Sequence, residues 1–153
     1  MYMQSGQAQK IARQEMKDGN NCCQSVIIAA CQIWDIDIPE GLIDAASLFG
    51  AGMHSGCSCG AMTGMIIASG LKARKRPDVK AEQIASQVHD RFKAAFGATC
   101  CRAIKKKRNP WERIGNRACI ELTGQAAAIL IELWEEYGEH GPAANIGDHP
   151  HAQ

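Results

Sequence analysis

Cys59-Gly60-Ala61-Met62-Thr63-Gly64 stands where a glycine-rich segment leads into a predicted helix that ends near Gly70. Glycine recurs at five positions between 50 and 64, and the same segment carries Cys57 as well as Cys59. Glycine at this density allows positive φ angles and a close approach of the backbone to other groups. We therefore predict a tight loop folded around a bound group, with Gly60 and Gly64 among the residues that contact a cofactor.

Cysteine is the residue type that connects this segment with the rest of the chain. Seven of the eight cysteines fall at four separate places, each beside a predicted helix start: Cys22 and Cys23, Cys57 and Cys59, Cys100 and Cys101, and Cys119. The free N–H groups at a helix start lower the pKa of a thiol, so this placement favours thiolates. Such thiolates could bind a metal, bind an iron–sulfur cluster or act as redox-active groups. Cys31 lies on an apolar helix face, where a small buried side chain is expected.

Helical patterns with glycine, asparagine and proline between them run through the whole chain. The patterns predict helices at about 7–17, 21–34, 37–49, up to 70, 79–96 and 110–137, with Asn20 or Asn21 capping the second. No window alternates in the manner of a strand. We predict an all-α single-domain bundle of five or six helices around a cysteine-lined site. Residues 1–138 form this helical domain, and 139–153, which include three of the histidines, form a flexible C-terminal tail.

Composition bounds the class of protein. A hydrophobic content of 46% and a charged content of 22% are ordinary for a globular domain, and a net charge of +1 gives no general attraction to nucleic acid. We find no secretory signal and no apolar run long enough to cross a bilayer, so we expect a cytoplasmic protein without a membrane segment. In a reducing cytosol, cysteines are ligands or catalytic groups more readily than disulfides.

Several known cysteine motifs are missing from the sequence. There is no Cys-x-x-Cys-His, which excludes covalent c-type haem. The close pairs typical of structural zinc and the C-x₂-C-x₂-C run of bacterial ferredoxins are also absent. A cluster site would therefore have to be assembled from separate helices, as metal sites in helical bundles commonly are.

Three stretches resemble one known family, the redox-active proteins named for their C…GCAxxG…C…C cysteine pattern. Asn21-Cys22-Cys23-Gln24-Ser25-Val26 is similar to the family's first element, Cys59-Gly60-Ala61-Met62-Thr63-Gly64 to its CGAxxG element, and Phe96-Gly97 with Cys101-Arg102 to its third cysteine. Cys119 supplies the fourth. The resemblance covers residues 20 to 137 and implies that these four positions form the functional set, Cys22, Cys59, Cys101 and Cys119. A related domain of split-Soret cytochrome c is associated with haem and an iron–sulfur centre.

These observations lead to one preferred function and two alternatives. We expect a cytosolic redox or electron-transfer protein that binds an iron–sulfur cluster through the four cysteines. The alternatives are a metal-free thiol–disulfide oxidoreductase and a metal-binding or metal-handling module. Cys23, Cys57 and Cys100, which the family pattern lacks, and His54 are possible additional ligands. No residue set for a defined substrate reaction is present.

Two further features bear on partners. The basic clusters at 72–76 and at 102–108 are normally solvated, but the second, if it flanks a centre near Cys101, would attract an acidic redox partner.

Trp111 is expected to anchor the last helix by packing. That helix carries a concentration of large apolar side chains that would suit a homodimer, as does the dimeric state of the related cytochrome domain: Ile129, Leu130, Leu133, Trp134 and Tyr137.

Overall fold

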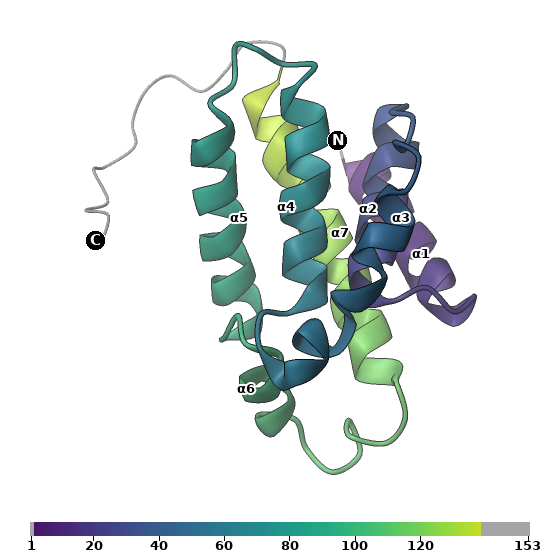
Figure 1. The fold of residues 1–153 in the computed structure, drawn as a ribbon. Helices are drawn as coiled ribbons and strands as arrows, with labels where there is room; N and C mark the ends of the chain where they lie inside the picture. Colours follow the sequence, from purple (N-terminus) through teal and green to yellow (C-terminus); the bar gives the residue numbers. More distant parts are fainter. Residues whose placement is uncertain (1, 139–153) are drawn as a thin grey trace.

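A computed structural model describes residues 2–138 of the chain (Figure 1). The described part contains seven α-helices and no strand beyond one isolated bridge. The helices are α1 (Tyr2–Lys17), α2 (Cys22–Trp34), α3 (Leu42–Ala45), α4 (Gly60–Ala73), α5 (Ala81–Phe96), α6 (Cys101–Lys106) and α7 (Arg117–Tyr137). The predicted all-α single domain is confirmed. The predicted tail at 139–153, with its histidines, lies outside the described residues.

The helix boundaries differ from the predicted ones at several places. Helix α1 begins at Tyr2 rather than near residue 7. Helix α3 begins only at Leu42, after Gly41 in a left-handed conformation (φ 79°). The predicted ranges include no helix at the position of α6, although Cys100 and Cys101 were expected beside a helix start, and α6 brings the number of helices above five or six. The last helix begins at Arg117 rather than Pro110, because the preceding residues form turns that include Gly115 at φ 67°.

Helix α7 forms the centre of the bundle, packing along α1 and also against α2, α4 and α5. Leu130 and Leu133 are fully buried, and Trp134, 4% exposed, donates a hydrogen bond from Nε1 to Ser69 Oγ at 3.2 Å. Nearly all the side chains that suggested a dimer surface on this helix therefore lie in the monomer core. Among residues 2–138, no helix is both long enough and apolar enough to span a bilayer.

A smaller apolar cluster lies between α2 and the α3 region. It contains Cys23 and Cys31, which are 0% and 1% exposed, together with Ile27 and Ile36. The interpretation of Cys31 as a small buried side chain is confirmed.

One end of the bundle gathers the segments that matter for the cysteines. Helices α2, α4 and α7 all begin toward this end, and α6 crosses it (Figure 1). The glycine-rich segment between α3 and α4 folds back over the same end as a 3-10 turn, Ala46–Leu48, and a π-type turn, Gly52–Gly56. Four helix N-termini and their free N–H groups are thereby brought to one region.

Candidate metal centre

A single cavity of about 290 Å³ at this end of the bundle is lined by all four cysteines of the predicted set. Cys22 begins α2, Cys59 is the N-cap of α4, Cys101 begins α6 and Cys119 lies in the first turn of α7. His54, Lys105 and Arg108 also line the cavity, whereas no Asp or Glu from residues 2–138 does. The structure thus brings together thiols separated by up to 97 residues of sequence.

Cys22 is positioned by a capping box at the start of α2. Asn21 Oδ1 accepts a hydrogen bond from Gln24 N, and Asn21 N donates to Gln24 Oε1, each at 2.9 Å. The two side-chain amides also bind the neighbouring chain: Asn21 Nδ2 donates to Ser47 O at 2.9 Å and Gln24 Nε2 to Ile43 O at 2.9 Å. This explains physically why an asparagine and a glutamine flank the first cysteine.

Gly60 and Gly64 let α4 approach the start of α2 closely. A Cβ at Gly60 would lie 2.4 Å from Cys22 Sγ, and one at Gly64 would lie 2.7 Å from the carbonyl oxygen of Cys23. Neither glycine lines the cavity. Their observed part is to set the spacing between the helices that carry Cys22 and Cys59.

Cys59 and Cys101 are held together by a short antiparallel pairing of backbone. Cys59 N donates to Thr99 O at 2.8 Å and Cys101 N donates to Cys57 O at 2.5 Å, on either side of the bridge between Ser58 and Cys100. Two helix starts that are 42 residues apart in sequence are therefore fixed relative to each other.

Ala51, Gly52, Met53 and His54 form a left-handed turn, with φ angles of 50°, 63°, 58° and 52°. For a residue other than glycine this conformation costs roughly 1–2 kcal/mol. The turn brings the backbone N–H of Ala51 to the Cys22 thiol, where it acts to lower the pKa of that thiol against the larger effect of burial. It also brings Gly52 so near Cys101 that a Cβ there would lie 2.8 Å from Cys101 Cβ. Strain of this kind is concentrated at functional sites.

Cys119 has a cationic neighbour. Arg108, which precedes α7 in the chain, donates a hydrogen bond from Nη1 to Cys119 Sγ at 3.2 Å. Arg108 is thus a site residue that sequence reasoning placed only within a basic cluster.

The pKa values of the thiols correct one expectation. Burial raises the pKa of the Cys59 thiol to about 12, and the nearby thiol of Cys22 adds to this effect, although the N–H groups of Ala61 and Met62 at the start of α4 oppose it. Burial and then the neighbouring Cys119 likewise raise the pKa of Cys22. The prediction that helix starts make these two cysteines thiolates is wrong for the protein without a bound cation, because desolvation outweighs the helix N-terminus.

The other candidate ligands are placed differently. His54 lines the cavity, but Cys23, Cys57 and Cys100 do not. Cys23 is fully buried in the α2–α3 cluster, Cys57 is exposed, and Cys100 donates from Sγ to Gly56 O at 3.0 Å.

The cysteines are not close enough to bind one ion. Among residues 2–138, no three His, Cys, Asp or Glu side chains form a group that could hold a metal ion as placed. A tetrahedral zinc with Zn–S bonds of about 2.3 Å needs thiolates about 3.8 Å apart. The cavity has room for roughly ten waters at about 30 Å³ each, far more than a bare ion fills. An all-thiol donor set around a space of this size fits a polynuclear cluster, whose metal and sulfide atoms separate the ligand sulfurs.

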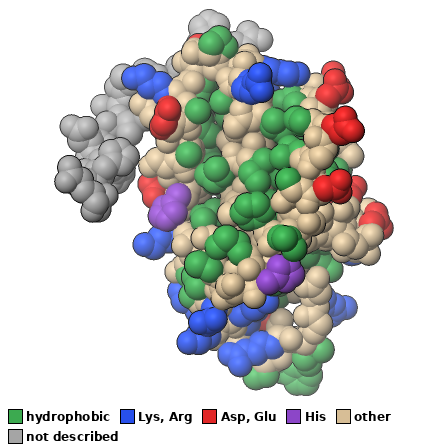
Figure 2. Space-filling view, viewed as in Figure 1, with side chains coloured by type: hydrophobic (Ala, Val, Ile, Leu, Met, Phe, Trp, Pro, Cys, Tyr) green, Lys and Arg blue, Asp and Glu red, His purple; other side chains and the backbone are tan. Residues whose placement is uncertain are grey.

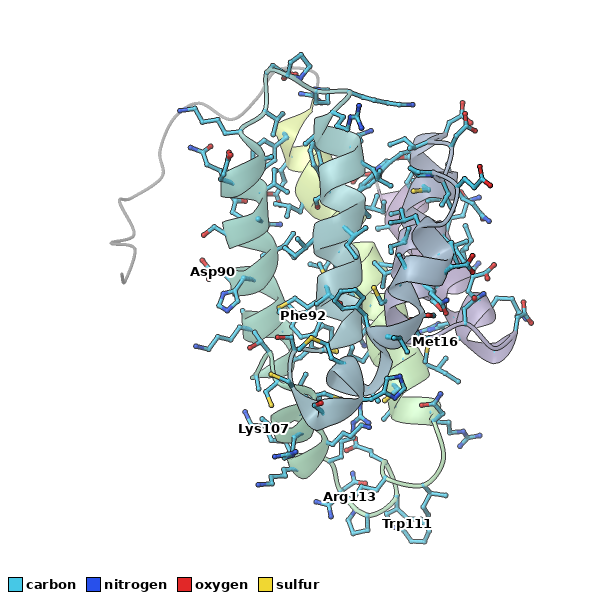
Figure 3. The ribbon with its side chains drawn as sticks, in the orientation of Figure 1. Met16, Asp90, Phe92, Lys107, Trp111 and Arg113 are labelled. Carbon is cyan, nitrogen blue, oxygen red and sulfur yellow. The ribbon has the colours of Figure 1, made fainter. Side chains whose placement is uncertain are left out.

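Trp111 departs from its predicted role. The side chain is 82% exposed and lies in the loop between α6 and α7, where it points away from the bundle (Figure 3). The prediction that it anchors the last helix by packing is wrong.

Comparison with known proteins gives one result. The family model described as "Putative redox-active protein (C_GCAxxG_C_C)" matches residues 20–133, a range that contains all four cavity cysteines and both capping-box residues. No curated protein and no solved structure gives a significant match to the chain. Since the family model covers most of the sequence, the chain belongs to the C_GCAxxG_C_C family of redox-active proteins.

Proposed function

We propose that the protein is an electron carrier that binds an iron–sulfur cluster through Cys22, Cys59, Cys101 and Cys119. The observation that carries this proposal is the single cavity in which the family's four cysteines meet without any carboxylate. Thiolate sulfur is the ligand that iron–sulfur clusters require. When bound, the cluster supplies reversible one-electron redox chemistry.

Hydrogen bonds at the site support a redox role for the bound group. Cys59 Sγ is positioned to accept from the N–H groups of Ala61 and Met62, Cys22 Sγ from those of Cys23 and Ala51, and Cys119 Sγ from Arg108. Hydrogen bonds to ligand sulfurs stabilise their negative charge and are one determinant of a cluster's potential. Burial of Cys59 and Cys101, 6% and 8% exposed, limits access of water to the ligands.

The metal-free oxidoreductase is the weaker candidate. Thiol–disulfide exchange requires a thiolate, and the attacking thiol works best when its pKa is near the ambient pH. The raised pKa values of Cys22 and Cys59 oppose this chemistry at neutral pH. A metal cation in the cavity would reverse the effect, because coordination deprotonates a thiol.

The metal-handling alternative would require the site to bind a single metal ion. The donors are too far apart and the cavity is too large for one ion, so this alternative is disfavoured. We keep the cytosol as the proposed location, because cysteines that serve as cluster ligands must stay reduced, which a reducing compartment favours.

Anaerobic purification followed by visible absorption and analysis of iron, sulfide and zinc tests the proposal. We expect iron and acid-labile sulfide in equal amounts, and their loss in Cys59→Ser and Cys119→Ser. The matched control is Cys31→Ser, a cysteine in the apolar cluster away from the cavity, with circular dichroism to verify folding. Zinc without sulfide would support the metal-handling alternative, and a metal-free protein with a reversible disulfide among these cysteines would support the oxidoreductase.

A further inference from the structure

A second cavity, of about 580 Å³, adjoins the cysteine cavity on the side of α6 and the loop that follows it. Both cavities have Cys101, Cys119 and Arg108 in their walls. Lysine and arginine side chains gather at this end of the molecule (Figure 2). Five cations line the second cavity: Arg102, Lys105, Lys106, Arg108 and Arg113. In the part of the chain that the structure describes, no Asp or Glu lines it.

The three arginines of this cavity are held in position by neutral acceptors. Arg102 Nη2 donates to Ser55 O at 3.1 Å. Arg113, labelled in Figure 3, donates from Nε to the backbone oxygen of Arg108 and from Nη2 to that of Lys106, both at 3.1 Å. Arg108 Nη1 donates to the sulfur of Cys119. Carbonyl and thiol acceptors fix the direction of a guanidinium group without neutralising its charge.

Three of the five other arginines within residues 2–138 pair with a carboxylate. Arg13 pairs with Glu121 and Arg91 pairs with Glu136. Within residues 2–138, none of the five cations of the second cavity forms an ion pair with a carboxylate. Like charges gathered without counterions repel one another, so the arrangement favours any anion that enters.

We propose that this cavity is a binding site for a small multivalent oxyanion of the phosphate type, free or as the end group of a small organic molecule. Arginine forks match such groups through paired hydrogen bonds, and the volume lies in the range of small-molecule sites. The concave shape favours a small molecule over an acidic protein, since the exposed Trp111 and Ile114 do not line it. The site goes beyond the proposed cluster and does not depend on it, but it would hold the anion beside Cys101 and Cys119.

Isothermal titration of the anaerobically purified protein with inorganic phosphate, inorganic pyrophosphate and phenyl phosphate tests the site. The titrations are run at constant ionic strength with chloride as the background anion. We expect saturable binding with one site per chain, and tighter binding of pyrophosphate than of phosphate. A preference for phenyl phosphate over phosphate would identify the organic ester as the form that the cavity takes. The reverse preference would identify the free anion.

Two variants and one control connect this binding to the cavity. Arg102→Gln and Arg113→Gln each remove one anchored guanidinium, and loss of a charged hydrogen-bonding partner should weaken affinity on the order of tenfold. Arg74→Gln makes the same change in net charge at the far end of α4 and should alter affinity less than twofold. Lys106→Gln, at an exposed position, gives a third test if an arginine variant loses its helical circular dichroism.

Three results would overturn the proposal. The first is that none of the three anions shows saturable binding. The second is that Arg74→Gln weakens anion affinity as much as the two cavity variants do. The third is that the protein binds only an acidic polymer such as polyglutamate, which would indicate an acidic protein partner instead. Iron and sulfide are measured in the same samples. A protein that lacks iron but binds pyrophosphate would refute the proposed cluster and support the anion site. A protein that contains iron and sulfide but binds no anion would support the cluster and refute the anion site.

Discussion

Replacing Gly60 with alanine should damage the cysteine site without removing any ligand. The added Cβ would lie 2.4 Å from Cys22 Sγ and 2.7 Å from the backbone oxygen of Phe49. Both distances are far inside van der Waals contact, and one of the two obstacles is backbone, which cannot rotate away. Either α4 moves away from α2 or the Cys22 side chain leaves its position.

The expected magnitude follows from this crowding. Overpacking of a filled interior typically costs about 1–3 kcal/mol. The change also removes a glycine from a helix. In a helix interior this replacement alone stabilises the variant by roughly 0.5–1 kcal/mol, and at the first residue of α4 it stabilises the variant by less. We expect a net loss of about 1–2 kcal/mol in the free energy of unfolding. For a chain of this length that corresponds to a fall in melting temperature of about 2–8 °C.

Gly70 provides a matched control on the same helix. A Cβ at Gly70 would meet no atom within 4 Å, so Gly70→Ala should stabilise the protein by roughly 0.5–1 kcal/mol. Urea unfolding of the metal-free proteins measures both changes, and iron content after anaerobic purification measures the effect on the site. The reasoning would be refuted by a Gly60→Ala protein with full iron and unchanged stability, or by equal changes in the two variants.

The remaining predictions concern the other cysteines, the pH dependence of stability, Arg108 and the oligomeric state. Cys57→Ser and Cys100→Ser should retain most of the iron, because neither side chain lines the cavity, and complete loss of iron in either would identify an extra ligand. Stability of the metal-free protein should fall between about pH 9 and 12, because the Cys59 thiol has a pKa of about 12 in the folded state and its ordinary value of 9.0 in the unfolded state. A urea midpoint that stays constant over this pH range would contradict this prediction. Arg108→Gln should lower the reduction potential of the cluster more than Arg74→Gln does, measured by redox titration, because it removes a cationic donor from Cys119 Sγ. The homodimer stays a prediction, and light scattering should give twice the chain mass of 16.5 kDa if it holds.

Local signals in the sequence were sufficient where local interactions decide the structure. The start of α2 was predictable because Asn21 and Gln24 cap it through bonds three residues apart. The end of α5 was predictable because Gly97 adopts a left-handed conformation there, with φ 77°. The four cavity cysteines were identified by family resemblance, and the position of Cys22 and Cys59 at helix starts was visible in the flanking residues.

Tertiary structure decided what the sequence did not reveal. Helix α6 is six residues long and rich in lysine, so it has no extended apolar stripe that would mark it. The contact of Arg108 with Cys119 spans eleven residues and the turns between α6 and α7. The raised pKa of Cys59 could not be predicted from its position before a helix. It results from burial, and the chain around Ala51 and Cys101, which lies far from Cys59 in sequence or on another helix, lines the same cavity.

The raised pKa values of the cavity thiols and the cations without carboxylate partners have one electrostatic explanation. Without a metal, the thiols of Cys22 and Cys59 stay protonated, because ionising either one places negative charge in a poorly solvated cavity beside other sulfurs. Binding of a metal group would release these protons and would leave a net negative charge, since four thiolates supply more charge than a metal ion or cluster core neutralises. Lys105 and Arg108 in the cavity wall then face that charge, with no carboxylate in the wall to compete. Metal binding should therefore be coupled to proton release and grow stronger as the pH rises toward the pKa values of the free thiols.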